Sequence, residues 1–144
     1  MSLTMTQVER ESFLAEVHVG VLSIPQAGLG PLTAPVWYGY VPGGDLWFLT
    51  GRSSRKGRLL HQDIRVSLCA QTELPPYKYV SIEGPVCAIV QANVERDARP
   101  MAHRYLGREL GDRYLESEAD GESILVRIRP ERWLSVDYGK QFAV

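Results

Sequence analysis

A run of hydroxyl, glycine and basic residues near the middle of the chain has the composition of an anion-binding site. It reads Thr50-Gly51-Arg52-Ser53-Ser54-Arg55-Lys56-Gly57-Arg58, with three hydroxyls and four cations. Hydroxyls donate hydrogen bonds to anions, and an arginine can hold a phosphate through two parallel bonds. This composition predicts a phosphate-group site. The alternative for the same residues is a solvated basic helix start, as is common for a short charge run.

The elements on either side of this run would place it at a strand-to-helix junction. Asp45-Leu46-Trp47-Phe48-Leu49 before it is apolar and is typical of a strand, and residues 57–62 after it have the pattern of a short helix. The start of a helix presents backbone N–H groups and the positive end of its dipole, which favour an anion. A threonine such as Thr50 can also cap the helix, and that role is compatible with phosphate contact.

The charge balance of the whole chain favours a small anionic ligand over a polyanion. The chain has 144 residues, 44% of them hydrophobic, with 16 basic against 17 acidic residues and a net charge of −1. Such a balance gives no general attraction to nucleic acid or to an anionic membrane. A length of this order suits one domain, and we expect a single domain over residues 1–144.

Cysteine, histidine and apolar patterns indicate neither a metal site nor a targeting segment. Cys69 and Cys87 lie in apolar strand-like runs and are expected to be buried thiols, although a disulfide between them stays open. The chain contains no CxxC, HExxH or His-rich motif, so no metal is expected. It has neither a signal-peptide pattern nor an apolar run of transmembrane length, so we expect a cytoplasmic protein.

The order of the predicted elements is that of an antiparallel barrel. Strand patterns follow one another without regular alternation with helices, which disfavours a Rossmann sheet. Pro35 cannot donate a ladder hydrogen bond, so its strand is expected at an edge or beside a bulge. The acidic residues after the second helical region are expected to be a solvated helix end. The predicted elements are helix 6–17, strands 19–24, 32–41, 45–50, 65–71, 77–91, 123–129 and 133–138, and a helical region 97–118 divided near Gly107 and Gly111.

Several of these segments, taken together, resemble a known family. The run from Asp45 to Leu68 looks like the flavin-binding segment of the pyridoxamine 5′-phosphate oxidase-like split-barrel family. Ala34-Pro35-Val36-Trp37 and the segment from Tyr79 to Val86 follow in the order and spacing of that family, and Pro130-Glu131-Arg132-Trp133 is similar to its lead-in to the last strand. The resemblance spans roughly residues 6 to 138.

The resemblance implies a mainly β fold, a six-stranded antiparallel split β-barrel of Greek-key type with short helices at its periphery. It also implies a homodimer with flavin sites at the subunit interface. The family's phosphate ligands correspond to Thr50, Ser54, Arg55 and Lys56, and Ser53 is a further hydroxyl candidate from the composition of the run. The flavin ring would run along Pro35, Val36 and Trp37, with Tyr79 as an additional contact.

Departures from the family pattern bear on the substrate. The oxidase itself carries basic residues near positions 34 and 39 and a later arginine- and serine-bearing motif for the substrate phosphate, and this chain lacks them. Oxidation of pyridoxamine phosphate is therefore not expected. Smaller actinobacterial-type relatives share the shorter pattern. Some of them use FMN, and others use the 8-hydroxy-5-deazaflavin coenzyme (F-420), which also carries a ribityl phosphate.

Three functions are consistent with these residues. The first is an oxidoreductase that transfers hydride between bound FMN or deazaflavin and a small organic substrate. No side chain stands out as a general acid, so the catalytic residue stays unknown. The second is a flavin-binding or sensor protein without turnover, because binding does not establish chemistry. The third is a haem-handling protein, which would need an axial ligand from a tyrosine or from His18, His61 or His103.

Overall fold

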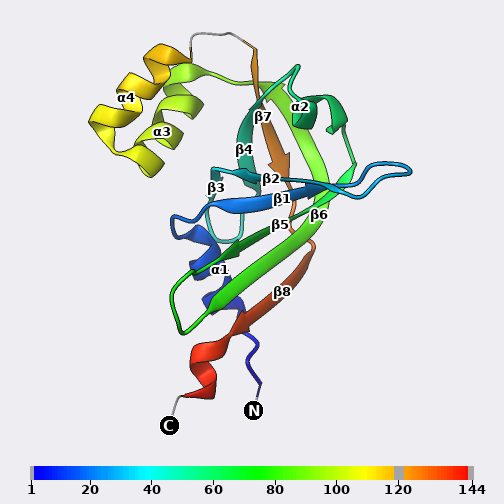
Figure 1. Cartoon of the computed structure of the whole chain (residues 1–144), viewed down its shortest axis with the longest axis vertical. Helices are drawn as coiled ribbons and strands as arrows, with labels where there is room; N and C mark the ends of the chain where they lie inside the picture. Colours follow the sequence, from blue (N-terminus) through cyan, green and yellow to red (C-terminus); the bar gives the residue numbers. More distant parts are fainter. Residues whose placement is uncertain (1, 119–121, 143–144) are drawn as a thin grey trace.

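The chain folds into a barrel-like antiparallel sheet with helices at its periphery, as Figure 1 shows. The computed structural model describes residues 2–118 and 122–142. The fold class expected from the sequence is confirmed, but the strand number is eight in this part of the chain rather than six. The strands are β1 (Gly20–Ile24), β2 (Leu32–Val36), β3 (Tyr38–Tyr40), β4 (Leu46–Gly51), β5 (Arg65–Gln71), β6 (Lys78–Gln91), β7 (Ser123–Ile128) and β8 (Arg132–Asp137).

The long strand β6 joins the two halves of the sheet. Its first part pairs with β5 and β8, and its last part pairs with β7, with a register shift between Val86 and Ala88. A β-bulge of this kind bends a strand and lets it serve two differently oriented sheets. The strand order β2-β1-β5-β6-β7-β4-β3 places β4 beside β7, so β4 to β7 have the order of a Greek key.

The extra strand arises because the stretch predicted as one strand over residues 32–41 is two. β2 ends at Val36 and pairs with β1, whereas β3 begins at Tyr38 and pairs with β4 in the other half. Trp37 between them belongs to neither ladder. Because β2 is a terminal strand of the sheet, the edge position predicted from Pro35 is confirmed.

A continuous apolar core fills the barrel. Alternate residues of the strands point inward, as the burial of every second residue on β4 and β5 shows. Tyr38 and Phe48 are its largest fully buried side chains. Trp133, expected in the core, is partly buried and packs against it.

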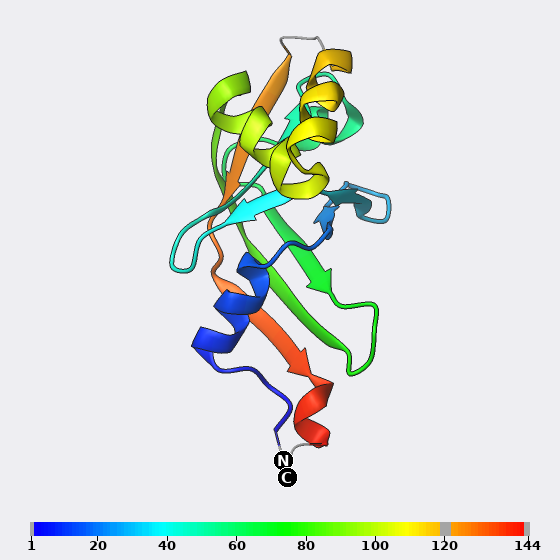
Figure 2. The ribbon, with the colours of Figure 1, turned by 90° about the vertical axis from the view of Figure 1, so that its left-hand side faces the viewer.

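The helices lie at the periphery of the barrel, and Figure 2 shows α1 and the α3–α4 pair on the same side of the molecule. Thr6 and Glu9 form the capping box that the sequence predicts at the start of the first helix. The helical region divides at Gly107 but not at Gly111, which lies inside α4 against the backbone of Ala102. The helices are α1 (Gln7–Ala15), α2 (Arg55–Leu59), η1 (Val94–Ala98), α3 (Arg99–Leu106), α4 (Arg108–Ser117) and η2 (Tyr138–Gln141).

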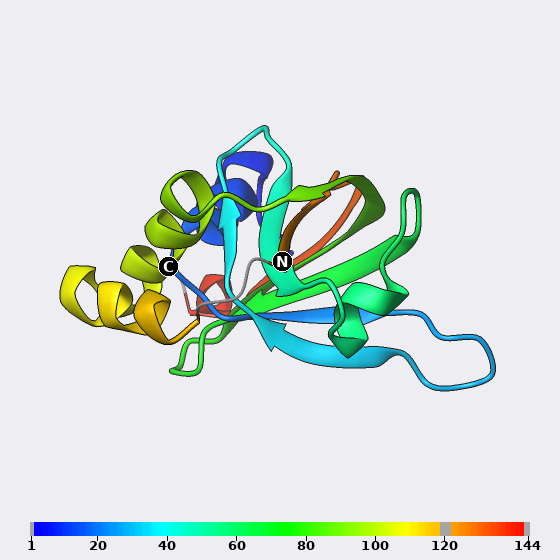
Figure 3. The same cartoon turned by 90° about the horizontal axis from the view of Figure 1, so that it is seen from above.

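Two side chains of α3 fix the α3–α4 hairpin to the barrel, and Figure 3 shows the hairpin projecting beside the sheet. The Arg104 guanidinium donates hydrogen bonds to the carbonyls of Ala15 and Glu16 at the end of α1. The Tyr105 hydroxyl donates to the carbonyl of His18 at 2.6 Å and accepts from the backbone N–H of Tyr38 at 3.0 Å. The hairpin is thus held beside the β2–β3 crossover, where the chain passes from one half of the sheet to the other.

Cys69 and Cys87 are free, so they form no disulfide, and they are partly rather than fully buried, because both lie on the outer side of their strands. Burial raises the pKa of each thiol, and the neighbouring Asp45 carboxylate raises the pKa of Cys87 further. Among residues 2–118 and 122–142, no helix is both long and apolar enough to cross a membrane.

Candidate functional site

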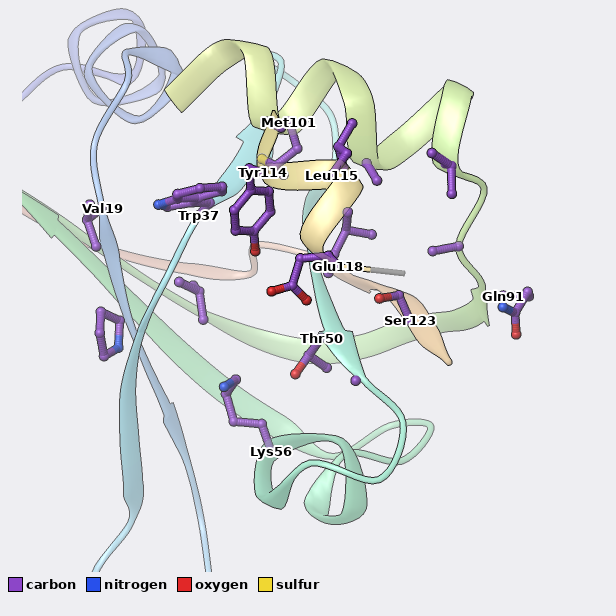
Figure 4. Close-up of a pocket in the computed structure, with 18 residues that line it drawn as sticks. Val19, Trp37, Thr50, Lys56, Gln91, Met101, Tyr114, Leu115, Glu118 and Ser123 are labelled. Carbon is purple, nitrogen blue, oxygen red and sulfur yellow. The ribbon is translucent and has the colours of Figure 1, made fainter. Parts of the chain in front are cut away.

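A pocket of about 440 Å³ opens between the barrel and the α3–α4 hairpin. Its volume lies within the range of roughly 300–1,000 Å³ typical of small-molecule sites. Three walls enclose it: the end of β4 with the following turn, the β2–β3 crossover, and the helical hairpin. Figure 4 shows side chains from all three walls directed toward the same space.

The first wall carries the polar end of the predicted phosphate site. Thr50 and Lys56 both line the pocket, and Figure 4 shows the Lys56 amine directed toward it from the short helix below. The Thr50 side chain is buried, and its hydroxyl lies 3.1 Å from that of Ser54. The Lys56 amine and the Thr50 hydroxyl are suitable groups for binding a phosphate, whereas Ser54 does not line the pocket and donates its hydroxyl proton to the backbone.

Ser54 shapes this wall as the N-cap of α2. Its hydroxyl accepts a hydrogen bond from the N–H of Gly57 and donates one to the carbonyl of Gly51 at 2.7 Å. The capping role considered for Thr50 therefore belongs to Ser54, and the helix begins at Arg55 rather than at Gly57 as predicted. A helix of five residues has a small dipole, so side chains must provide most of the attraction for an anion.

The other basic and hydroxyl residues of the run lie at its outer side. Arg55 and Ser53 are exposed and do not line the pocket within one chain. The Ser53 hydroxyl donates to the Glu122 carboxylate at 3.2 Å, and the Arg52 guanidinium lies 3.5 Å from the Gln91 amide oxygen. The contact of Arg52, Ser53 and Arg55 with a phosphate stays a prediction.

The second wall is the β2–β3 crossover, where Pro35, Val36 and Trp37 all line the pocket. Their contact with a flavin ring stays a prediction. The Trp37 indole stacks on the Tyr105 ring with centroids 5.0 Å apart and planes 7° from parallel. The tilted Tyr114 ring lies 5.4 Å away on another side. β2 is the edge strand of the sheet, so no strand covers its outer side. Its backbone and the neighbouring Trp37 indole are therefore available to a flat ligand.

The third wall was missed by the sequence analysis. Seven apolar or polar residues of η1, α3 and α4 line the pocket opposite the first two walls. The sequence gives no spacing signal that connects a surface helix pair with a strand about fifty residues earlier. The missed residues are Val94, Ala98, Met101, Ala102, Tyr114, Leu115 and Glu118.

Tyr114 and Glu118 are the polar members of that helical wall. Tyr114 lies on α4 and Glu118 is the residue that caps its C-terminal end, and Figure 4 shows the phenol and the carboxylate directed toward the side where Thr50 lies. Burial and then the Glu118 charge raise the pKa of Tyr114. The helix end expected to be merely solvated therefore contributes Glu118 to the pocket, while Ala119 and Asp120 lie outside the described residues.

Other candidate residues lie elsewhere. Tyr79 sits on β6 between Gln71 of β5 and Val136 of β8, outside the pocket lining, so its ring contact stays a prediction. His103 is held by Asp112 at 2.6 Å on the hairpin, and none of the three histidines lines the pocket. Within the described part of the chain, no group of three or more His, Cys, Asp or Glu residues is arranged to hold a metal ion.

The barrel and the pocket between its strands and a helical hairpin agree with one family. The sequence matches the family model of pyridoxamine 5′-phosphate oxidase over residues 7–137. The chain therefore belongs to the pyridoxamine 5′-phosphate oxidase family. A comparison with curated proteins gives no match.

Solved structures share the fold at low sequence identity. A conserved hypothetical protein from Mycobacterium tuberculosis superposes with a TM-score of 0.79 and 23% identity over 99% of this chain and 91% of that one. An F420 reductase superposes with a TM-score of 0.62 and 24% identity over 86% of this chain and 94% of that one. An FAD-binding protein from Mesorhizobium loti superposes with a TM-score of 0.61 and 20% identity over 92% of this chain and 94% of that one. At these identities the likeness establishes the fold.

Proposed function

We propose that the protein is an oxidoreductase that binds a flavin-type cofactor in this pocket and exchanges hydride with a small organic substrate. The observation that carries the proposal is the convergence of two predicted segments on one cavity. Thr50 and Lys56 provide a phosphate end, and Pro35 to Trp37 provide a flat ring-binding wall of the same pocket. These two segments begin on different strands, and the folding of the sheet brings them to one pocket.

The residues present fit such a cofactor. The cavity combines a polar end, which suits a ribityl phosphate, with a mainly apolar remainder that suits a planar ring system. Lys56 is the cation that lines this end, and Arg55, its neighbour on the first turn of α2, is exposed outside the pocket lining. A phosphate monoester carries about −1.5 to −2 charges at neutral pH, so it would more than offset the charge of Lys56.

Two cofactors satisfy these requirements, FMN and the 8-hydroxy-5-deazaflavin coenzyme F-420. Both carry the ribityl phosphate for which the Thr50–Lys56 wall is suited. The F420 reductase and the FAD-binding protein that share the fold support a flavin-type group in general. The choice between FMN and the deazaflavin depends on the ring, which the phosphate wall does not contact.

When bound, such a cofactor supplies the hydride chemistry through its ring. The residues of this chain anchor and orient it. Lys56 and Thr50 would hold the phosphate, with Thr50 positioned by Ser54, and Trp37, fixed by its stack on Tyr105, would hold the ring plane. The apolar side chains of the helical wall, among them Met101 and Leu115, exclude water from the ring. No general acid is assigned, and pyridoxamine phosphate is not the expected substrate.

A second subunit is part of the proposal. Val19 lines the pocket yet is about half exposed, and Val21, two residues further along the same face of β1, is also exposed. A homodimer that covers this face would bury both side chains and close the pocket on its open side. Tyr79 and Ser53, which do not line the pocket of one chain, are then candidate contacts at the interface.

Two alternatives remain as competing functions. A flavin-binding or sensor protein would use the same pocket without turnover. A haem-handling protein would need an axial ligand, and the described residues that line the pocket offer Tyr114 and Met101 but no histidine, the usual ligand. The pocket therefore favours a flavin-type cofactor over haem.

The first test is titration of the purified protein with FMN and with F-420, followed by absorption and fluorescence. We expect one of them to bind with a micromolar or lower dissociation constant. Lys56→Ala should raise that constant about tenfold or more, since it removes a charge-assisted contact to the phosphate. Arg58→Ala, on the exposed side of the same helix, is the control. Equal affinity of Lys56→Ala and the wild type for both cofactors would refute the phosphate wall.

The second test separates an enzyme from a binding protein. The bound cofactor is reduced and then mixed in a stopped-flow instrument with a panel of neutral and charged quinones and enones. If the protein is an oxidoreductase, at least one acceptor should reoxidise the bound, reduced cofactor faster than buffer does. Reoxidation at the buffer rate with every acceptor would support the sensor alternative.

A further inference from the structure

The described residues that line the pocket include two charged side chains, and they lie on different walls. Lys56 comes from α2 and Glu118 comes from the end of α4. In Figure 4 the Lys56 amine and the Glu118 carboxylate both project into the space between the helical hairpin and the β4 end. The pocket therefore has a cationic pole and an anionic pole.

The Glu118 carboxylate has no cation to neutralise it. Glu118 is exposed, and within residues 2–118 and 122–142 no Lys, Arg or His forms an ion pair with it. Its neighbour in the pocket is the phenol of Tyr114, one helical turn earlier, which is neutral at physiological pH. The carboxylate charge is thus available to a ligand.

Binding of a cofactor phosphate leaves this carboxylate as the dominant charge of the remaining space. A bound phosphate would offset the charge of Lys56, the cation among the described residues that line the pocket. What remains between the ring-binding wall and α4 is then an apolar space bounded by Met101, Leu115 and Tyr114, with Glu118 at its edge. An anion brought there would lie near the Glu118 carboxylate, and the repulsion between like charges costs free energy.

We propose that Glu118 is a specificity-determining residue that makes the cofactor-loaded pocket favour neutral or cationic aromatic substrates over anionic ones. The apolar side chains of the α3–α4 hairpin provide the surface for the flat, uncharged part of the substrate. Glu118 accepts a hydrogen bond from a donor or ammonium group at its edge, and it repels a carboxylate, sulfonate or phosphate. This assignment rests on the proposed function, since it supposes that the phosphate end is occupied by the cofactor.

The test uses the cofactor-loaded protein and three redox-inert ligands of the same shape. These are 2-naphthylmethylammonium, 2-naphthalenemethanol and 2-naphthalenesulfonate, and their dissociation constants are measured by isothermal titration calorimetry and by perturbation of the cofactor's visible absorption. We expect the wild type to bind the first two more tightly than the sulfonate. Glu118→Gln, which keeps the shape and removes the charge, should lower the preference for the ammonium over the sulfonate by about three- to tenfold, as expected for a partly exposed charge pair.

Glu116→Gln is the matched control. It removes the same charge from the same helix, but Glu116 does not line the pocket, so the preference should stay at the wild-type value. Thermal unfolding of both variants checks that the hairpin is intact. An unchanged preference in Glu118→Gln, with cofactor affinity retained, would overturn this assignment and leave the proposed function standing. A wild-type protein that binds neither FMN nor F-420 would instead overturn the proposed function.

Discussion

Ser54 is the residue on which the polar end of the pocket depends. Its hydroxyl accepts from the N–H of Gly57, donates to the carbonyl of Gly51, and lies 3.1 Å from the Thr50 hydroxyl. One side chain thus caps α2, closes the turn after β4 and orients a second hydroxyl. A residue in this position links the stability of the turn to the binding of an anion.

We therefore expect Ser54→Ala to affect stability and binding together. Loss of the cap should lower the free energy of unfolding by about 0.5–2 kcal/mol, measured by urea denaturation. The dissociation constant for the cofactor should rise as well, because the Thr50 hydroxyl loses its partner. Ser53→Ala is the comparison for the unfolding measurement alone, since Ser53 is exposed and bonds Glu122 rather than the turn. An unfolding midpoint of Ser54→Ala equal to that of the wild type would contradict the capping role.

At the scale of elements, α2 is held close to the strand that precedes it. A Cβ added at Gly57 would come within 2.7 Å of the carbonyl oxygen of Arg52 and even closer to that of Gly51. Because both obstacles are backbone atoms, they cannot move aside without a shift of the whole turn. The absence of a side chain at position 57 is what lets α2 present Lys56 to the pocket.

Gly57→Ala should consequently destabilise the protein, although alanine is the better helix former by about 1 kcal/mol. The collision with two carbonyl oxygens outweighs this gain, and we expect a lower melting temperature and weaker cofactor binding in the same titration. Gly30→Ala serves as the control because a Cβ there meets nothing within 4 Å. A Gly57→Ala protein as stable as the wild type would show that the turn is looser than the structure indicates.

At the scale of the whole molecule, the β1 face of the barrel is the surface proposed for a second subunit. Val19 and Val21 expose 51% and 45% of their surface there, and Val19 belongs to the pocket lining. Apolar side chains next to a half-open ligand site are typical of an interface that completes the site.

The corresponding prediction concerns the mass in solution. The wild type should sediment at twice the chain mass of 16.2 kDa, measured by analytical ultracentrifugation. Val21→Glu should raise the dimer dissociation constant about tenfold or more, because a carboxylate would be buried in an apolar interface, and cofactor affinity should fall with it. Leu74→Glu, in the exposed β5–β6 turn, is the control. A wild type that is monomeric at micromolar concentration would refute the dimer.

The sequence by itself determined the class of fold, and it predicted the two polar residues, Thr50 and Lys56, that line one end of the pocket. Alternating apolar residues and tight turns act over a few residues, so the strands, the Thr6–Glu9 capping box and the edge position of Pro35 were predictable. The Thr50 to Lys56 run was recognisable because its donors are contiguous. The break at Trp37 was not, because which half of the sheet a strand joins depends on its partners β1 and β4.

Only the tertiary structure decided how the pocket is completed. Arg104 and Tyr105 reach back to residues almost ninety positions earlier and fix the α3–α4 hairpin above the β2–β3 crossover. That placement brings Tyr114 and Glu118 opposite Thr50 and Lys56. No local pattern encodes this pairing, because it results from packing between surfaces that are distant in sequence. The proposed phosphate end is therefore predictable from a contiguous run of residues, whereas the helical wall of the pocket is formed only in the folded molecule.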